Sequence, residues 1–414
     1  MIFTRQKVKQ GSLIFSWALY DLASQFFVLN VISLYFARWL VLEKGAPEIL
    51  YSLSFGFSNL LIAFFSPSLG VLSDTLRRRR PFLILFTLIT ALATSVLGVR
   101  QNILLVLFLF ALANFAFHLA LIFYNALMEY IVPEDKAGLI SGLGRMFGYT
   151  GAIFALYLIK PIAQAKGYQS TFLPTAILYL LLALPCMIFI KDRPSADKKP
   201  ILGQLPGPRE IAGTLKDLWG YMLDARRYPV ISNFLKASFF VLCGVNVIVL
   251  FMSIYATQAF GLNMAQVTNL IALSAVFAVL GSLASGILGD RLGHLRLLRV
   301  IFILWVFCFL FGAFSRHILL YWVTGALVGI ALGATWTVAR ALAMKLVPRQ
   351  NLGKIFGLFN LATYLAAIVG PLFWSLFLFF LKPLGEWGYR LSMFVLIWFT
   401  FFGIIFLSRI PKEK

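Results

Sequence analysis

The sequence has few charged residues and few groups that could carry covalent chemistry. Of its 414 residues only 12% are charged, and the three cysteines, Cys186, Cys243 and Cys308, all lie within long apolar runs. A cysteine in such a run behaves as a small hydrophobe, so we predict no disulfide and no cysteine metal site. The sequence also has no P-loop, no His-Glu-x-x-His and no Gly-x-Ser-x-Gly motif, which disfavours an enzyme and predicts no cofactor.

Apolar residues are abundant instead. Hydrophobic residues make up 61% of the chain, more than the core of a soluble protein of this length can bury. They fall into twelve runs, each close to the roughly 20 residues that cross a bilayer as a helix. We therefore predict an all-α membrane protein with twelve transmembrane helices.

The basic residues are unevenly distributed between these runs. A net charge of +21 would suggest nucleic acid as the partner of a soluble protein. With twelve spans, however, 25 Lys and Arg residues fall on the side of the two termini and eight on the opposite side. By the positive-inside rule, both termini face the cytosol, and we expect a multi-pass protein of the plasma membrane that does not bind nucleic acid.

Two stretches 215 residues apart share one pattern. Residues 123–151 and 338–366 agree at nine of 29 positions, including Pro133/Pro348 and Gly138/Gly353. Because proline marks helix boundaries and glycine allows close packing, both stretches are predicted to break and restart a helix at the same place. The chain is interpreted as two related halves in the same order, a parallel repeat that is typical of membrane transporters.

The repeat predicts two pseudo-symmetric six-helix bundles, residues 1–191 and 229–414. The stretch between them, residues 192–228, is rich in proline and in charged residues. We interpret this stretch as a cytosolic linker.

The motif Gly-x-x-x-Asp occurs twice, after the second and the eighth apolar run, and basic residues follow each copy. It resembles the signature loop of the major facilitator superfamily, Gly-x-x-x-Asp-Arg-x-Gly-Arg-Arg. In that superfamily the loop latches the two bundles on the cytosolic side, where a carboxylate near a helix N-terminus and an arginine can form charge-assisted bonds. The resemblance implies these gating residues: Gly70, Asp74, Arg78, Gly286, Asp290 and Arg291.

A finer resemblance lies in the first half. Residues 16–21, 123–127 and 141–149 read SWALYD, FYNAL and SGLGRMFGY. They look like the branch of the superfamily that includes the vacuolar amino-acid effluxer of autophagy and its bacterial relatives. This resemblance implies the major facilitator fold and suggests amino-acid export.

Polar residues recur at helical spacing in the fourth apolar run. Asn114, His118, Asn125 and Glu129 are 4, 7 and 4 residues apart, which places them on one face of a helix. Polar groups inside a span are costly and usually face a cavity or a neighbouring helix. The stripe predicts a cavity lining, although His118 taken alone could simply bond to another helix. Glu129, near the membrane edge, is expected to be a gate partner for the loop arginines.

The first run carries Trp17, Asp21 and Gln25, each four residues apart. Asp21 lies about 15 Å from the start of the helix, near the midplane. A carboxylate there must pair or take a proton, because desolvation penalises its charged form. Lys236 holds the equivalent position in the second half, so we expect Asp21 to pair with it across the cavity and to couple protons. Such a pair could also serve only to order the bundle.

Two arginines are predicted inside spans. Arg145 and Arg340 each lie about two helical turns from a cytosolic boundary, where a guanidinium could hold a carboxylate or phosphate bidentately. Each could also extend to the cytosol, and Arg145 could pair with Glu129. Further binding candidates at related positions are Tyr149, Trp336, Asn360 and Tyr364.

These observations predict a secondary transporter of the major facilitator type that works by alternating access. We expect proton-coupled export of an amino acid or a similar zwitterion, by a monomer whose partners are this small molecule, protons and the lipid bilayer. The many Phe and Trp residues leave open the export of a lipid-like or drug-like amphiphile. A transport-dead membrane receptor or scaffold is a further alternative, although the longest loop has only about 38 residues.

Overall fold

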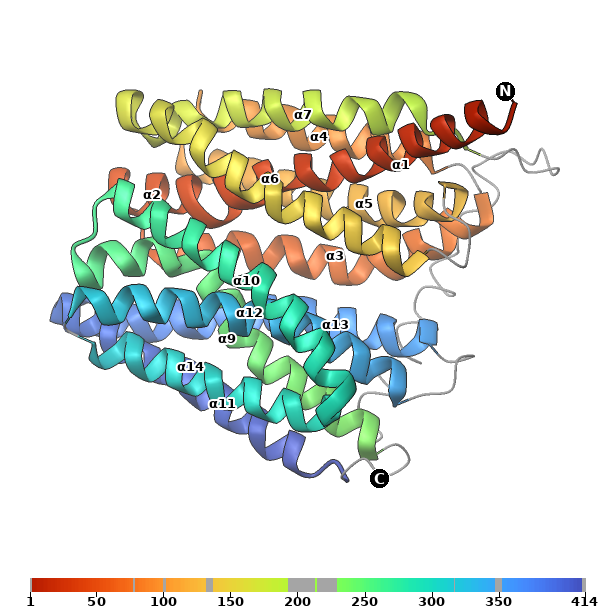
Figure 1. The fold of residues 1–414 in the computed structure, drawn as a ribbon. Coiled ribbons are helices and arrows are strands. Elements are labelled where there is room, and N and C mark those ends of the chain that lie inside the picture. Colours follow the sequence, from red (N-terminus) through yellow and green to blue (C-terminus); the bar gives the residue numbers. More distant parts are fainter. Residues whose placement is uncertain are drawn as a thin grey trace. The chain divides into compact units, whose positions relative to one another are not determined.

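The computed structural model describes residues 2–76, 79–99, 102–131, 137–192, 213, 229–315, 317–346 and 352–411. Every regular element in these ranges is a helix, as predicted (Figure 1). In chain order they are α1 (Ile2–Phe27), η1 (Val28–Tyr35), α2 (Phe36–Arg38), η2 (Trp39–Glu43), α3 (Glu48–Leu76), α4 (Arg80–Leu97), α5 (Ile103–Ile131), α6 (Ala137–Lys166), η4 (Tyr168–Thr171), α7 (Phe172–Phe189), α9 (Pro229–Phe260), α10 (Met264–Leu292), α11 (His294–Phe314), α12 (Ile318–Lys345), α13 (Leu352–Leu381), η7 (Lys382–Leu384) and α14 (Glu386–Ser408).

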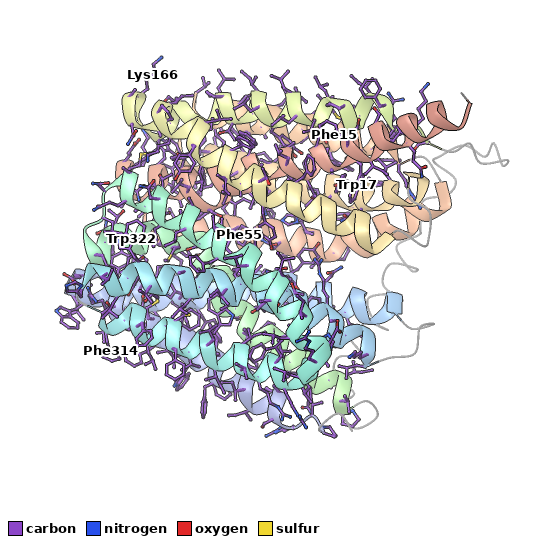
Figure 2. The ribbon with its side chains drawn as sticks, viewed as in Figure 1. Phe15, Trp17, Phe55, Lys166, Phe314 and Trp322 are labelled. Carbon is purple, nitrogen blue, oxygen red and sulfur yellow. The ribbon has the colours of Figure 1, made fainter. Side chains whose placement is uncertain are left out.

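Within the described residues, eleven helical segments are long and apolar enough to cross a membrane. Their apolar side chains also point outward: Phe15 and Phe314, labelled in Figure 2, are 54% and 63% exposed. Exposure of such an extensive apolar surface to water is unfavourable, whereas in a bilayer lipid covers it. The chain is therefore an integral membrane protein. The helix α6 lies at the remaining expected position, and the count of twelve spans stays a prediction.

The first span changes its helix type along its length. After α1, the segments η1 and η2 are π-helical and the three-residue α2 lies between them. A π-helix has wider turns than an α-helix and is frequent at functional sites. Within η1, Asn30 to Tyr35 are all buried, so the wide turns lie among other helices. They place the Asn30 side chain in the interior, where neither its amide nitrogen nor its oxygen has a hydrogen-bond partner in the structure.

Contacts divide the chain into two units. One comprises Met1–Trp39 and Leu61–Ala212, and the other Leu40–Leu60 and Gly213–Lys414. In the first unit, α1 packs on α6 and α7, while α4 packs on α5 and α7; in the second, α9 packs on α13 and α14, while α11 packs on α12 and α14. The same pattern thus recurs in the same order, as a parallel repeat predicts. The boundaries expected around residues 192–228 remain a prediction, because most of that stretch lies outside the described residues.

Glycines bring some helices to within backbone contact. On α12, a Cβ at Gly329 would lie 2.1 Å from the main-chain oxygen of Ser274 in α10, and one at Gly333 2.0 Å from that of Ala278. In the first unit, a Cβ at Gly151 of α6 would lie 2.5 Å from the oxygen of Leu22 in α1. Small residues at such spacing let membrane helices gain dispersion contacts that lipid cannot supply. They fix α10 on α12 and α6 on α1.

Candidate functional site

The contact between α1 and α5 holds Trp17 in an aromatic cluster. Trp17, labelled in Figure 2, stacks on Tyr124 with ring centroids 4.9 Å apart, and Tyr20 stacks on the same Tyr124 ring at 4.7 Å. Trp17 Nε1 donates to the main-chain oxygen of Tyr124 at 3.3 Å, and the Tyr124 hydroxyl donates to that of Trp17 at 3.1 Å. These reciprocal bonds fix both rings. Trp17 is therefore a rigid, buried platform.

A chain of hydroxyl groups continues from this cluster into α4 and α7. The Tyr20 hydroxyl lies 2.7 Å from Thr87 Oγ1 and 3.2 Å from the Tyr179 hydroxyl. All three side chains are buried. Sequence analysis did not identify Tyr20, Tyr124, Tyr179 or Thr87, because an isolated hydroxyl residue in an apolar run does not reveal which helix it meets.

Asp21 and Gln25 lie against α6. Both side chains are partly buried on α1. A Cβ added at Gly148 of α6 would lie 4.0 Å from Asp21 Cβ and 3.8 Å from Gln25 Nε2. The Asp21 carboxylate also interacts with Tyr124. Trp17, Asp21 and Gln25 therefore occupy the part of α1 that meets α5 and α6, and the glycine leaves room beside the carboxylate.

The Lys236 ammonium lies 5.7 Å from the centroid of the Phe406 ring, which belongs to α14. A lysine over an aromatic face gains cation–π attraction, which partly offsets the loss of water. Asp21 belongs to the first unit and Lys236 to the second, so the predicted pairing of the two stays a prediction.

The polar stripe of α5 spans a wide range of burial. Asn114 is fully buried, His118 is half-buried with its ring 5.4 Å from that of Phe117, and Asn125 is exposed. Over its three described side chains, the stripe therefore runs from the buried Asn114 to the exposed Asn125.

Several candidates of the second unit cluster where α12 meets α13. The Trp336 ring contacts Phe359 edge-on at 6.3 Å, and Phe359 stacks on Phe234 of α9 at 5.9 Å. Arg340 lies one turn beyond Trp336 on α12 and is exposed. Asn360 directly follows Phe359 and is also exposed, while Tyr364, one turn further on, is half-buried. Along α12 and α13, an arginine, an amide and a tyrosine thus closely follow the two residues of one aromatic contact.

The second copy of the signature motif is helical almost throughout. Asp290 and Arg291 lie in the last turn of α10, and only Gly293, with φ +88°, separates α10 from α11. A glycine tolerates this left-handed conformation, so the expected loop contracts to a single residue. Asp290 Oδ1 lies 3.5 Å from His294 Nε2 at the start of α11, and a Cβ at Gly286 would lie 3.9 Å from Thr337 of α12.

The remaining candidates are described only in part. Tyr149 is half-buried on α6. The backbone of four further candidates is helical but their side chains are not among those described: Gly70, Asp74, Glu129 and Arg145. Arg78 lies outside the described residues altogether.

A buried carboxylate that sequence analysis missed lies at the start of α3. Glu48 is 3% exposed, and its Oε2 lies 3.0 Å from Lys382 Nζ of η7. The Tyr389 hydroxyl of α14 donates to Glu48 Oε1 at 2.5 Å. One turn further along α3, Ser52 donates to the main-chain oxygen of Pro371 in α13. The first two turns of α3 are thus bonded to α13, η7 and α14.

Beside this cluster, Arg390 joins the ends of three helices. Its guanidinium, 5% exposed, donates to the main-chain oxygens of Ala259 in α9 at 2.9 Å and of Ala313 in α11 at 3.3 Å. It also contacts Glu386 Oε1 at 2.7 Å and lies 4.5 Å from the centroid of the Phe260 ring. Sequence analysis counted Lys382 and Arg390 only as basic residues of non-cytosolic loops.

The described residues contain no group of three or more His, Cys, Asp or Glu side chains that could hold a metal ion. Cys186, Cys243 and Cys308 are buried and free.

Comparison with known proteins identifies a family. Residues 44–414 match the family described as "Vacuole effluxer Atg22 like". The chain is 24% identical over 418 residues to YxiO of Bacillus subtilis (strain 168), an uncharacterized MFS-type transporter, covering 96% of this chain and 94% of the relative. It is 26% identical over 354 residues to the multi-drug resistance efflux pump PmrA of Streptococcus pneumoniae serotype 4, covering 84% and 83%.

The fold also matches solved structures. A mutant of the nucleoside transporter NupG superposes with a TM-score of 0.76 at 13% identity, covering 98% of this chain and 100% of the other. At this identity the match concerns the fold alone. The match extends over nearly the whole length of both chains.

Proposed function

The chain belongs to the family of Atg22-like vacuole effluxers, and we propose that it exports a small organic solute by alternating access as a secondary active transporter. Membership makes it an MFS-type transporter. The transporters among its relatives support transport rather than catalysis. From the polar groups of the spans, we propose that the substrate is an amino acid or a similar zwitterion and that its export is coupled to protons.

We propose twelve spans in two six-helix bundles, with α6 as the span added to the eleven candidates. The contact pattern that recurs in the two units supports this arrangement. The excess of basic residues on the side of the termini supports cytosolic termini, in the plasma membrane. We propose that the transporter works as a monomer.

The observation that carries the function is the partly buried Asp21 between a fixed aromatic platform and a glycine. Carboxylates inside spans are rare and mark substrate or proton pathways. Trp17 and Tyr124 are locked to each other, so they offer a fixed surface next to Asp21. Gly148 of α6 lies against Asp21, where an added Cβ would make only ordinary contacts. We propose that Asp21 takes and releases the coupled proton, with Gln25 contacting the substrate and the buried Trp17 fixing the wall beside them.

In the second unit, Arg340, Asn360 and Tyr364 are the proposed partners of the substrate's anionic group. A guanidinium suits a carboxylate because its planar fork forms two parallel hydrogen bonds. The side chains of Arg340 and Asn360 are both exposed. Trp336 and Phe359 supply an adjacent apolar surface.

Export of a drug-like amphiphile is the second candidate. One relative is a multi-drug resistance efflux pump, and the interior contains large aromatic side chains such as Trp305 and Trp374. An amphiphile would rely more on the half-buried Trp336 ring than on Arg340.

Transport by purified protein in proteoliposomes distinguishes these proposals. Wild-type protein should concentrate a labelled amino acid when a pH gradient is imposed, and Asp21→Asn should retain exchange of the amino acid without the gradient but lose this accumulation. A Ser408→Ala variant, changed at an exposed residue at the end of α14, serves as the control. Accumulation of the amino acid by Asp21→Asn would contradict the coupling role. If wild-type protein transports cationic dyes but no amino acid, this would favour the amphiphile as substrate.

A further inference from the structure

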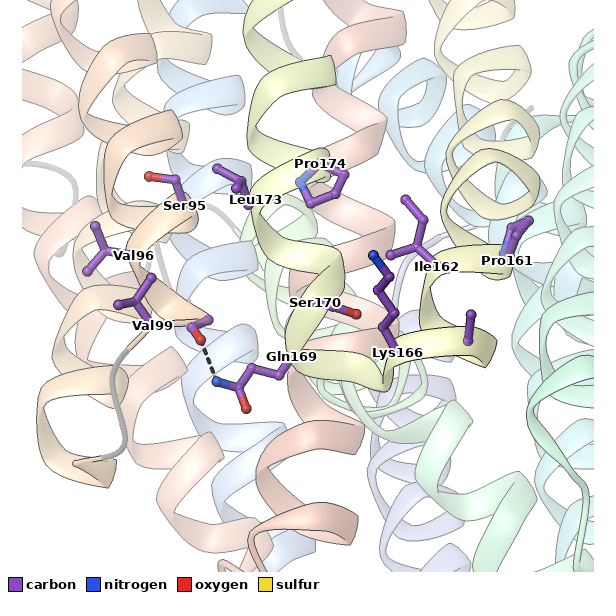
Figure 3. Close-up of a pocket in the computed structure, with 12 residues that line it drawn as sticks. Ser95, Val96, Val99, Pro161, Ile162, Lys166, Gln169, Ser170, Leu173 and Pro174 are labelled. Atoms are coloured by element: carbon purple, nitrogen blue, oxygen red, sulfur yellow. Dashed lines mark hydrogen bonds between the residues drawn. The ribbon is translucent and has the colours of Figure 1, made fainter.

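The first unit contains a cavity of about 790 Å³ away from the residues assigned to transport (Figure 3). It lies where α4 ends, where α6 ends and where η4 leads into α7. A volume of this size falls within the range of ligand sites, about 300 to 1,000 Å³. Its lining residues are Ser95, Val96, Gly98, Val99, Pro161, Ile162, Ala165, Lys166, Gln169, Ser170, Leu173 and Pro174.

The cavity crosses the end of the membrane spans. One candidate span ends at Leu97, one residue before Gly98, and another begins at Tyr168, one residue before Gln169. Gln169 Nε2 donates to the main-chain oxygen of Gly98 and thereby ties the end of α4 to η4. The cavity therefore lies at the level where lipid headgroups meet acyl chains.

Most of the cavity wall is apolar and faces outward. Leu173 is 54% and Val99 71% exposed, and Ile162 and Pro174 complete the wall on α6 and α7. This wall is continuous with the outward-facing apolar side chains of the spans, so acyl chains can enter it laterally without crossing water.

Lys166 is the one charged residue among the twelve that line the cavity. In Figure 3 its side chain extends from the last turn of α6 into the space between α6 and α7, toward Ile162 and Pro174. Side chains lean toward the N-terminus of their helix, and for α6 this direction leads into the membrane. The Lys166 ammonium is therefore presented to the cavity.

We propose that this cavity is a binding site for an anionic glycerophospholipid. Its phosphate would accept hydrogen bonds from Lys166 and from the second N–H of the Gln169 side-chain amide, which the bond to Gly98 does not use, while one acyl chain would lie along Ile162 and Leu173. Charge complementarity selects the headgroup because the cavity carries one cation and no carboxylate. A zwitterionic headgroup would bring its own ammonium toward Lys166 and would be bound more weakly.

Native mass spectrometry of the purified full-length protein with phosphatidylglycerol or phosphatidylcholine tests this proposal. Wild-type protein should bind phosphatidylglycerol roughly fivefold more tightly than phosphatidylcholine. This is the difference in affinity expected from one lysine near an anionic headgroup. Lys166→Gln should remove this preference, and Lys166→Arg should retain it. Ala165→Trp keeps the charge but fills the cavity, and should reduce the binding of both lipids at this site.

Lys160→Gln is the matched control, because Lys160 lies on the same helix, over the Tyr157 ring, and does not line the cavity. It should retain the preference for phosphatidylglycerol. Equal binding of the two lipids by wild-type protein, or an unchanged preference in Lys166→Gln, would overturn the proposal. Displacement of bound phosphatidylglycerol by inorganic phosphate would also overturn it, since the site would then recognise a free anion and not a lipid.

Discussion

The Glu48 carboxylate and the Lys382 ammonium meet at 3.0 Å although 334 residues separate them in the chain. Glu48 is buried, whereas 45% of the Lys382 side chain is exposed. A carboxylate this deeply buried needs partners that offset its lost hydration, and Lys382 and Tyr389 supply them. The pair therefore holds the start of α3 against η7 and α14.

We predict that Glu48→Gln loosens this contact. An amide cannot neutralise Lys382, and a partly exposed ion pair contributes about 1 kcal/mol, or roughly a fivefold change in population. The measurement is the rate at which an impermeant thiol reagent modifies Ser52→Cys, since Ser52 is buried one turn along α3 from Glu48. The rate should rise roughly fivefold in Glu48→Gln.

Two further variants test the charge pairing itself. The exchange Glu48→Lys with Lys382→Glu should restore the low rate of modification, because it preserves an opposite pair. Glu386→Gln, which alters an exposed carboxylate on α14, should leave the rate unchanged. An exchange variant no better than Glu48→Gln would show that the charges do not hold α3.

Arg390→Lys should lower stability more than its conservative appearance suggests. Lysine keeps the charge but cannot contact the oxygens of Ala259, Ala313 and Glu386 at once, which the guanidinium does. Carbonyls left without donors in a buried site should cost about 2 to 4 kcal/mol. Thermal unfolding in detergent measures this effect, and a melting temperature equal to that of wild type would contradict it.

Gly329→Ala should destabilise the protein, whereas the same change at Gly312 should not. The added methyl at Gly329 would overlap the Ser274 oxygen, while a Cβ at Gly312 meets nothing within 4 Å. Overpacking typically costs about 1 to 3 kcal/mol, and alanine is the better helix former by about 1 kcal/mol where space allows. Thermal unfolding of the two variants side by side gives the comparison. Equal melting temperatures would show that α10 and α12 separate readily.

The proposed orientation predicts which sites a membrane-impermeant maleimide reaches in intact cells. A cysteine replacing Leu384, an exposed residue of η7, should be labelled, and one replacing Ser195 should be labelled only after the cells are permeabilised. The native cysteines are buried and should add little background. Labelling of the Ser195 variant in intact cells would reverse the topology.

The helices were predictable because spans are long and apolar, and the repeat was predictable because Pro133 and Gly138 recur 215 residues later. The contacts of Glu48 could not be predicted from the sequence. Hydropathy and charge counts assign a residue to a side of the membrane, but they carry no information about which distant helix it meets. The same limit explains why Lys382 and Arg390 were interpreted only as loop charges.

The candidate site was predictable where one helix alone determines the spacing. Trp17, Asp21 and Gln25 share one part of α1 because they are four residues apart. Tyr20 and Tyr124 were not identified, because their role depends on contacts between α1, α4, α5 and α7. The single-residue turn at Gly293 was not predicted, because the motif resembles one that forms a longer loop. Only the φ of +88° reveals how sharply the chain turns.

The three hydroxyls of Tyr20, Thr87 and Tyr179 have one further consequence. Either partner can be the donor in each of their two contacts. Since each hydroxyl carries a single hydrogen, the bonds can run from Tyr179 toward Thr87 or in the opposite sense, with the heavy atoms in the same positions. Rotation of three light O–H groups would thus reverse a local dipole inside the first unit. The direction of this dipole can therefore respond to a change of charge nearby without movement of any helix.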